Sequence, residues 1–197
     1  MKNVLRALRL RKVQALVVTA VVAGAGAAAA IVPTVAASAS SNSAARPAAV
    51  PRCTTASLRV WLAVPGDGTA GPIYYALELS NVSNGACTIY GYPGVSAVAA
   101  GGKQLGSAAR RNAVKPATLI TLAKGATAHV QLGITDPGFF SPSACPRANA
   151  IGLRVYPPND TASTIVDFPF AACGKAGPSF LSVSVAIPGV GIPGYNV

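Results

Sequence analysis

Residues 81–95 read NVSNGACTIYGYPGV, and this stretch decides the fold that we expect for the chain. It follows a run of alternating apolar residues, places Cys87 after an Asn84-Gly85 turn, and ends in a Tyr92-Pro93-Gly94 corner. Asn-Gly is typical of turns that need a positive φ, and Pro-Gly predicts a sharp corner before the next strand. The stretch therefore indicates two successive strands of an exported, disulfide-bonded all-β domain.

Short runs of alternating apolar and polar residues continue on both sides of this stretch. A period of two is typical of a half-buried strand, and Gly, Pro, Asn and Asp separate the runs. The predicted strands cover 57–64, 73–80, 95–99, 103–105, 118–122, 126–134, 151–155, 164–168 and 180–187. A break at Pro65-Gly66-Asp67-Gly68 is expected to end the first strand. Because no helical period follows the N-terminal leader, the pattern predicts an antiparallel sandwich or barrel.

The N-terminal segment has the parts of a secretory signal peptide. Basic residues precede an uncharged apolar run over 13–32, and a small-residue stretch follows. We expect a helical signal peptide over 1–39, cleaved after Ala36 or Ala39, and a disordered Ala/Ser/Pro linker over 40–52. The protein would then be secreted or retained in the cell envelope, and would meet the membrane only transiently. The alternative is an uncleaved anchor formed by the apolar run, which is near the length of a membrane span.

The remaining chain is expected to form a β-sandwich domain over 53–187 and a Pro/Gly-rich tail of little regular structure over 188–197. The formal net charge is +11, and five of the basic residues lie in the leader. The other basic residues are scattered and are not interleaved with aromatic residues. We therefore expect no nucleic-acid partner.

The four cysteines, Cys53, Cys87, Cys145 and Cys173, all follow the leader. An even number in an exported chain indicates disulfides, for which three pairings are possible. We favour Cys53–Cys87 and Cys145–Cys173, because each bond then ties the edge of one strand pair. Each closes a loop of about thirty residues, worth roughly 3.5 kcal/mol in the chain-entropy account. A metal site needs closely spaced Cys or His residues, so neither a metal nor another cofactor is expected.

No residue pattern indicates catalysis. His129 lies in the predicted strand 126–134, on the face opposite Val130, and we expect it to face solvent. The five acidic residues lie mostly in turns, and no nucleophile motif or phosphate-binding loop is present. We therefore interpret the domain as a non-enzymatic module that binds an unknown envelope or extracellular partner, with a protein as one candidate.

The loops 65–72 and 139–147 are the candidate contact surfaces. Phe139-Phe140 would present an exposed apolar pair, or would be buried beneath the second loop. Pro146 and Arg147 directly follow a cysteine, and substrate-like serine-protease inhibitors present a basic residue from a disulfide-braced loop. The alternative function is therefore a secreted serine-protease inhibitor with Arg147 in its reactive loop. Otherwise Arg147 is simply solvated.

The order of these motifs resembles that of a known family. Its most specific segment is Cys87-Thr88-x-Tyr90-Gly91-Tyr92-Pro93-Gly94-Val95, which follows Tyr75-x-Leu77-x-Leu79-x-Asn81 and precedes Leu122-x-Lys124-Gly125-x-Thr127-Ala128. The chain is similar from Cys53 to Val185 to an actinobacterial secreted family known as domain of unknown function 4232. The resemblance implies an exported immunoglobulin-like β-sandwich with two disulfides and no assigned activity. Many members look like lipoproteins, but this chain has no cysteine at the end of its apolar run.

Overall fold

The computed structural model describes residues 49–68 and 71–191. The predicted signal peptide, most of the predicted linker and residues 192–197 lie outside these ranges. The described part consists of β-strands and three short 3-10 helices, with no α-helix. Within it, we find no helix with the length and apolar character that a membrane span requires.

The elements are short and follow one another closely along the chain. In order they are η1 (Thr55–Ser57), β1 (Leu58–Asp67), β2 (Pro72–Asn81), β3 (Cys87–Tyr90), β4 (Gly94–Val98), η2 (Ala100–Gly102), β5 (Gln104–Leu105), β6 (Arg110–Arg111), β7 (Leu119–Leu122), β8 (Thr127–Thr135), η3 (Pro137–Phe139), β9 (Arg147–Tyr156), β10 (Thr164–Cys173), β11 (Leu181–Val183) and β12 (Ile187–Pro188).

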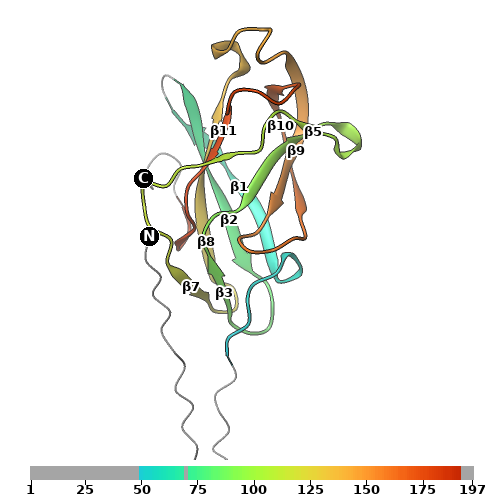
Figure 1. The fold of residues 1–197 in the computed structure, drawn as a ribbon. Helices are drawn as coiled ribbons and strands as arrows, with labels where there is room; N and C mark the ends of the chain where they lie inside the picture. Colours follow the sequence, from blue (N-terminus) through green and yellow to red (C-terminus); the bar gives the residue numbers. More distant parts are fainter. Residues whose placement is uncertain (1–48, 69–70, 192–197) are drawn as a thin grey trace, which may run out of the picture. The chain divides into compact units, whose positions relative to one another are not determined.

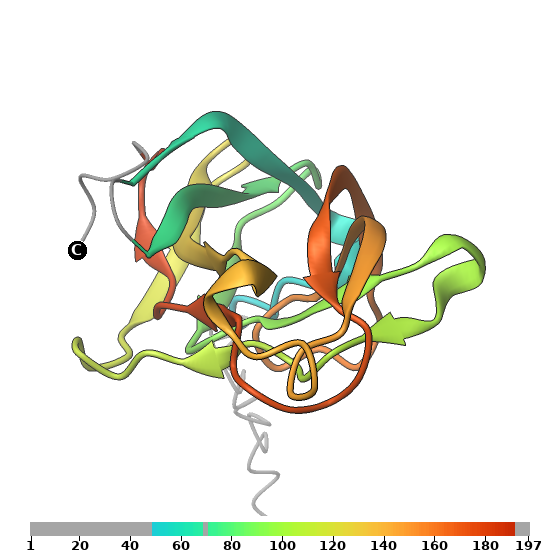
Figure 2. The same cartoon turned by 90° about the horizontal axis from the view of Figure 1, so that it is seen from above.

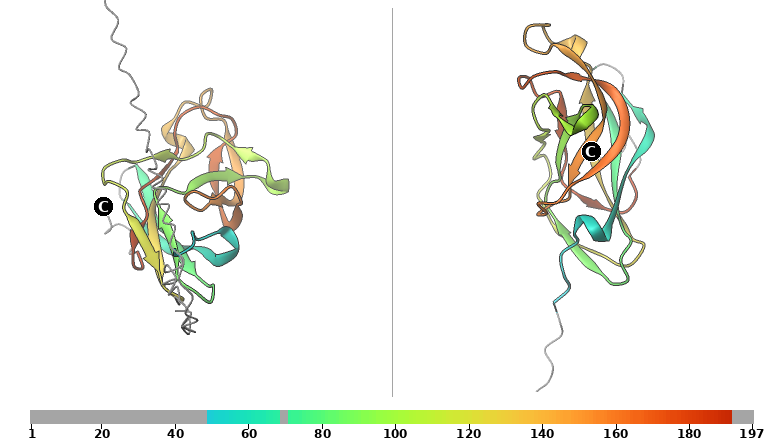
Figure 3. Two further views of the ribbon diagram at one scale, coloured as in Figure 1. Left: turned by 60° about the horizontal axis from the view of Figure 1, so that its bottom comes forward. Right: turned by 90° about the vertical axis from the view of Figure 1, so that its right-hand side faces the viewer.

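The strands form two main sheets that face each other, as predicted for a sandwich. The first sheet has the order β1-β2-β8-β11-β6, with β12 also paired to β8, and the second has the order β10-β9-β4-β5. Figures 1 and 2 show them as two layers, and the second sheet lies in front in the right-hand view of Figure 3. The strand pairs are antiparallel except β11–β6, which is parallel. A separate β3–β7 pair lies at the lower end in Figure 1.

One apolar core fills the space between the layers. Its buried members come from both main sheets and include Leu77, Leu79, Val95, Val130, Leu132, Leu153 and Val155. Burying a side chain of this kind stabilises the fold by about 1.5–3 kcal/mol. The inward face that the alternation predicted for 73–80 and 126–134 is therefore confirmed at Leu77 and Val130.

Both favoured disulfides are confirmed. Cys53–Cys87 joins the segment before β1 to the first residue of β3, and Cys145–Cys173 joins the loop before β9 to the last residue of β10. The two bonds span sequence separations of 34 and 28 residues. Each bond therefore closes a long loop and removes conformational freedom from the unfolded chain.

The predicted end of the first strand at Pro65 is wrong. β1 continues to Asp67, and its register with β2 shifts between Ala63 and Asp67. A shift of this kind is a β-bulge, and it accommodates a proline because β1 is an edge strand, where a missing N–H breaks no ladder. A second shift, between Asp167 and Phe170, lets β10 run beyond the predicted strand 164–168.

The predicted turn at Asn84-Gly85 forms by a different mechanism. Gly85 has no positive φ, whereas Gly91 has a φ of 93° just before the corner that leads into β4. The turn is held by the Asn81 side chain, whose Nδ2 donates to the Gly85 carbonyl at 2.9 Å. The Ser83 N–H donates to Asn81 Oδ1 at 3.0 Å. A side-chain bridge thus holds the turn without the positive φ that the dipeptide had indicated.

Candidate functional site

The outer face of the first sheet carries polar side chains in cross-strand rows. Residues directly opposite one another in an antiparallel pair point to the same face. The register places Arg59, Ser80 and Thr127 in one row and Trp61, Glu78 and His129 in the next. These two rows lie side by side on β1, β2 and β8, but their surroundings differ.

The first row borders an open groove, which we call the Trp61 groove. It has a volume of about 550 Å³ and is lined by Arg59, Trp61, Ser80, Asn81, Val82 and Gly125. This volume lies in the range of small-ligand sites in proteins. Among the described lining residues, Arg59 is the only charged one. The groove therefore favours a ligand that is neutral or negatively charged.

Trp61 is fixed within the groove and is partly exposed. It is the only tryptophan of the chain and keeps 37% of its surface accessible. Its indole N–H donates to Ser80 Oγ at 3.2 Å, and Ser80 Oγ lies 2.8 Å from Thr127 Oγ1. These bonds connect three neighbouring strands. Because the N–H is already engaged, the exposed part of Trp61 offers a ligand mainly apolar ring surface.

The floor of the groove is rigidly attached to the rest of the domain. Asn81 is fully buried, and its Nδ2 also donates to the carbonyl of Leu122 at 2.9 Å and to that of Ala123 at 3.2 Å. Val82 stays exposed beside it. The groove is thus built on a strand end that hydrogen bonds hold to the β7–β8 turn.

The second row is covered by the end of the described chain. We call residues 187–191 the C-terminal strap. Ile187 pairs with His129 at the edge of β8, and Gly189, with a φ of 93°, turns the chain across the outer face. The Gly189 carbonyl lies 2.8 Å from His129 Nδ1, and the Gly191 N–H donates to Glu78 Oε1 at 2.9 Å. Pro188, which we expected in a tail of little regular structure, thus belongs to β12, whereas residues 189–191 form no helix or strand.

Three polar side chains lie buried on this face. Glu78, His129 and Gln131, which we call the polar cluster, are only 0%, 4% and 8% exposed. The expectation that His129 faces solvent is wrong, because the strap covers it. Burial raises the pKa of Glu78, and the hydrogen bond from Gly191 offsets this only in part. Among the described residues, Glu78 Oε2, His129 Nε2 and Gln131 Nε2 have no hydrogen-bond partner.

The strap lies on the sheet without space for a side chain at Gly191. A Cβ atom built there would lie 2.8 Å from Ala76 Cβ and 2.8 Å from His129 Cδ2. Real Cβ atoms do not approach other atoms so closely. Glycine at this position is therefore what lets the main chain reach Glu78.

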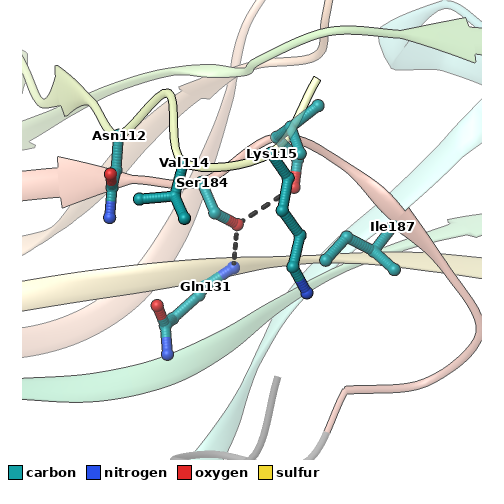
Figure 4. Close-up of a pocket in the computed structure, with 7 residues that line it drawn as sticks. Asn112, Val114, Lys115, Gln131, Ser184 and Ile187 are labelled. Carbon is teal, nitrogen blue, oxygen red and sulfur yellow. Dashed lines mark hydrogen bonds between the residues drawn. The ribbon is translucent and has the colours of Figure 1, made fainter. Parts of the chain in front are cut away.

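A small cavity lies at the upper end of the polar cluster, beneath the segment that follows β6. It has a volume of about 20 Å³ and is lined by Asn112, Val114, Lys115, Gln131, Ser184, Val185 and Ile187. Figure 4 shows the Gln131 main-chain N–H bonded to Ser184 Oγ, at 2.9 Å, while the side-chain amide points away from this bond. The cavity has room for about one water molecule and none for an organic ligand.

Of the predicted contact residues in the loop 139–147, Phe139, Pro146 and Arg147 are exposed and Phe140 is not. Phe139 is 67% exposed, whereas Phe140 is half-buried and packs against the core. Arg147 is the first residue of β9, pairs with Cys173, and forms an ion pair with Asp136. The Pro146 carbonyl accepts the Gly174 N–H at 2.6 Å. The main chain on either side of Cys145 is therefore held by hydrogen bonds.

Neither the groove nor the polar cluster was singled out from the sequence. The alternation does place Arg59 and Trp61 on the face opposite Leu58 and Val60, so a signal for an outward face existed. Among residues 49–68 and 71–191, no group of three or more His, Cys, Asp or Glu side chains is arranged to hold a metal ion. The arrangement thus offers a groove for binding and a covered polar cluster.

The comparisons with known proteins identify a family but no activity. A family model described as Domain of unknown function (DUF4232) matches residues 53–186. The match includes all four cysteines and extends from the start of the domain to the residue before β12. No curated protein and no solved structure matches the chain.

Proposed function

The chain belongs to the DUF4232 family, and from this premise we propose that its domain is an exported, non-enzymatic module that binds its ligand in the Trp61 groove. The family description names no activity, so the proposal depends on the geometry of the site. The observation that carries it is the partly exposed Trp61 ring, anchored by Ser80 in a groove of about 550 Å³.

Export is supported by the leader pattern and by the two disulfides. Disulfides persist in oxidising compartments and are rare in the cytoplasm. Cys53–Cys87 also ties β3 to the segment before β1, which supports the strand that carries Trp61. A scaffold that is already rigid loses little conformational freedom when a ligand binds.

The groove chemistry favours a hydroxyl-rich, negatively charged polymer of the cell envelope. An indole face provides apolar contact for the C–H face of a sugar ring. Arg59 provides charged N–H donors for hydroxyl or carboxylate oxygens, and no carboxylate among the described lining residues opposes it. The same lining holds no histidine or carboxylate that could activate Ser80 as a nucleophile, which supports binding rather than catalysis.

The test is affinity electrophoresis of the purified protein through gels that contain either polygalacturonate, an acidic glycan, or dextran, a neutral one. We expect polygalacturonate to retard the wild type, and Trp61→Ala to weaken this binding at least tenfold. Arg59→Gln should weaken binding to polygalacturonate and leave any binding to dextran unchanged. Phe139→Ala is the matched control, because it removes an exposed aromatic ring from the other candidate surface.

Two results would contradict the proposal. One is wild-type affinity in Trp61→Ala, and the other is migration of the wild type unaffected by either glycan. Loss of binding in Phe139→Ala alone would move the contact surface to the loop 139–147.

No observation favours the protease-inhibitor alternative. An inhibitory loop offers its main chain to a protease, whereas Arg147 is paired with Cys173 in the β9–β10 ladder. Inhibition through Arg147 stays a prediction from the sequence.

A further inference from the structure

We propose that the polar cluster of Glu78, His129 and Gln131 is a second binding site, which takes the main chain of a glycine-containing peptide that turns as the C-terminal strap does. In this structure the C-terminal strap occupies the site as an internal ligand. The site is separate from the Trp61 groove and does not depend on what that groove binds.

The strap is bound as a peptide ligand would be. Its first residues pair with the part of β8 that β11 leaves uncovered, where Ile187 pairs with His129 and the Gly189 N–H donates to the Thr127 carbonyl at 2.9 Å. Addition of a strand to a sheet edge is a general mode of peptide recognition. None of the strap residues has a polar side chain, so the domain recognises main-chain atoms.

Two side chains of the cluster recognise opposite polar groups of this main chain. Glu78 accepts an N–H, from Gly191, and His129 Nδ1 contacts a carbonyl, that of Gly189. Gly189 and Gly191 lie two residues apart on the strap. The side chains that contact them, His129 and Glu78, belong to residues directly opposite each other in the β2–β8 register. This spacing specifies a peptide segment that turns at the position of Gly189 and then lies across the strands.

The strap leaves hydrogen-bonding capacity unused. Glu78 Oε2, His129 Nε2 and Gln131 Nε2 are buried and have no partner among the described residues. Burying polar atoms without partners is unfavourable, so a ligand that supplies partners to them gains binding free energy. A peptide that bears a polar side chain would satisfy some of these atoms and would therefore compete with the strap.

The site favours glycine at two positions, that of Gly189, whose φ is 93°, and that of Gly191, where a side chain has no space. The main chain of Gly191 lies against Ala76 and His129 so closely that a Cβ atom would collide with both. A side chain at the corresponding position of any ligand would meet the same two residues. The proposed ligand class is therefore a Gly-x-Gly segment that turns at its first glycine and places its second glycine against Glu78.

The test displaces the strap and supplies its sequence as a separate peptide. In the full chain, Gly191→Val places a side chain against Ala76 and His129 and expels the strap. The matched control is Gly85→Val, because a Cβ atom at Gly85 meets no atom within 4 Å and Gly85 has no positive φ. Thermal melting first establishes that both variants are folded. If Gly191→Val is unfolded, Gly191→Ala replaces it.

The probe is a synthetic peptide with the sequence of the strap, residues 187–191, measured by calorimetry and by the emission of Trp61. Trp61 lies opposite Glu78 in the β1–β2 register and is the only tryptophan, so its emission reports on this site. We expect Gly191→Val to bind the peptide at least tenfold more tightly than the wild type and Gly85→Val, and to recover the wild-type emission on binding. A peptide with valine at the position of Gly191 should not bind.

Three outcomes would overturn the proposal. The first is no binding of the peptide to Gly191→Val or its replacement. The second is equal binding to the wild type and to the displaced variant, since an occupied site must compete. The third is equal affinity for the glycine and valine peptides, which would make the binding independent of the contact at Ala76 and His129.

Discussion

The Trp61 groove and the polar cluster lie on the same face of the same sheet, and yet one is open and the other is closed. Trp61, Glu78 and His129 even belong to one cross-strand row. Trp61 is partly exposed, whereas Glu78 is fully buried, because the C-terminal strap crosses only the β2 and β8 part of the row. Exposure on a sheet face therefore depends on what crosses over it, and the strand pattern itself does not determine it.

The largest effect is expected from removal of the Cys53–Cys87 disulfide, which stabilises the domain that carries both regions. Replacing Cys53 and Cys87 with serine releases β3 from the segment before β1. The free energy of unfolding should fall by about 3.5 kcal/mol, the chain-entropy value for a loop of this length. Chemical denaturation of the variant and of the wild type measures this. A loss confined to glycan binding, with unchanged stability, would show that the bond shapes only the groove.

The second largest effect is a pH dependence of stability, which arises from Glu78 in the polar cluster and has no counterpart at Trp61. Burial raises the pKa of Glu78 above its ordinary value of 4.5, so the folded state favours the protonated carboxyl. The stability that Glu78 contributes is therefore fully present below pH 4.5 and is lost as pH rises through the raised folded pKa. Glu78→Gln should become more stable relative to the wild type as pH increases from 4.5. Parallel denaturation curves across pH measure this difference in stability. A difference that does not change with pH would contradict a raised pKa of Glu78 in the folded state.

The smallest effect concerns Asp160, which lies away from both regions. Its pKa is lowered, whereas that of Glu78 is raised. Asp160 accepts hydrogen bonds from the main chain of Ala162 and from Thr55, and these bonds lower its pKa to about 2. Its contribution is present above the ordinary value of 3.8 and is lost as pH falls toward about 2. Asp160→Asn should therefore lower stability at neutral pH and converge with the wild type near pH 2. Melting curves at pH 7 and in acid test this, and equal stability at both would refute it.

Local pattern was enough to predict the disulfides and the position of most strands, but not the full extent of β1 and β10 or the break between β11 and β12. The alternation over 73–80 and 126–134 gave the inward faces, because every second side chain of a strand points to the core. The cysteine order, with each pair flanking one set of strands, gave the two disulfide pairs that the structure confirms. The strand faces follow from neighbouring residues, and the disulfide pairs follow from the order of the cysteines along the chain.

The groove and the cluster depend on contacts that sequence pattern does not show. The groove requires the register that places Ser80 between Arg59 and Thr127, and a shift of one residue would turn each side chain to the other face. Burial of His129 depends on Gly189, 60 positions later in a Pro/Gly-rich segment with no period. Such a segment resembles a loose tail until the surface that it covers is known.

The central claim is that the strap covers the polar cluster and leaves the Trp61 groove open. Its most direct test is labelling of the single histidine with diethyl pyrocarbonate, followed by mass spectrometry. His129 is 4% exposed beneath the strap, so the wild type should resist labelling while acrylamide still quenches the emission of Trp61. Gly191→Val should label readily, and Gly85→Val should resist as the wild type does. Labelling of wild-type His129 at the rate of the denatured chain would contradict the account.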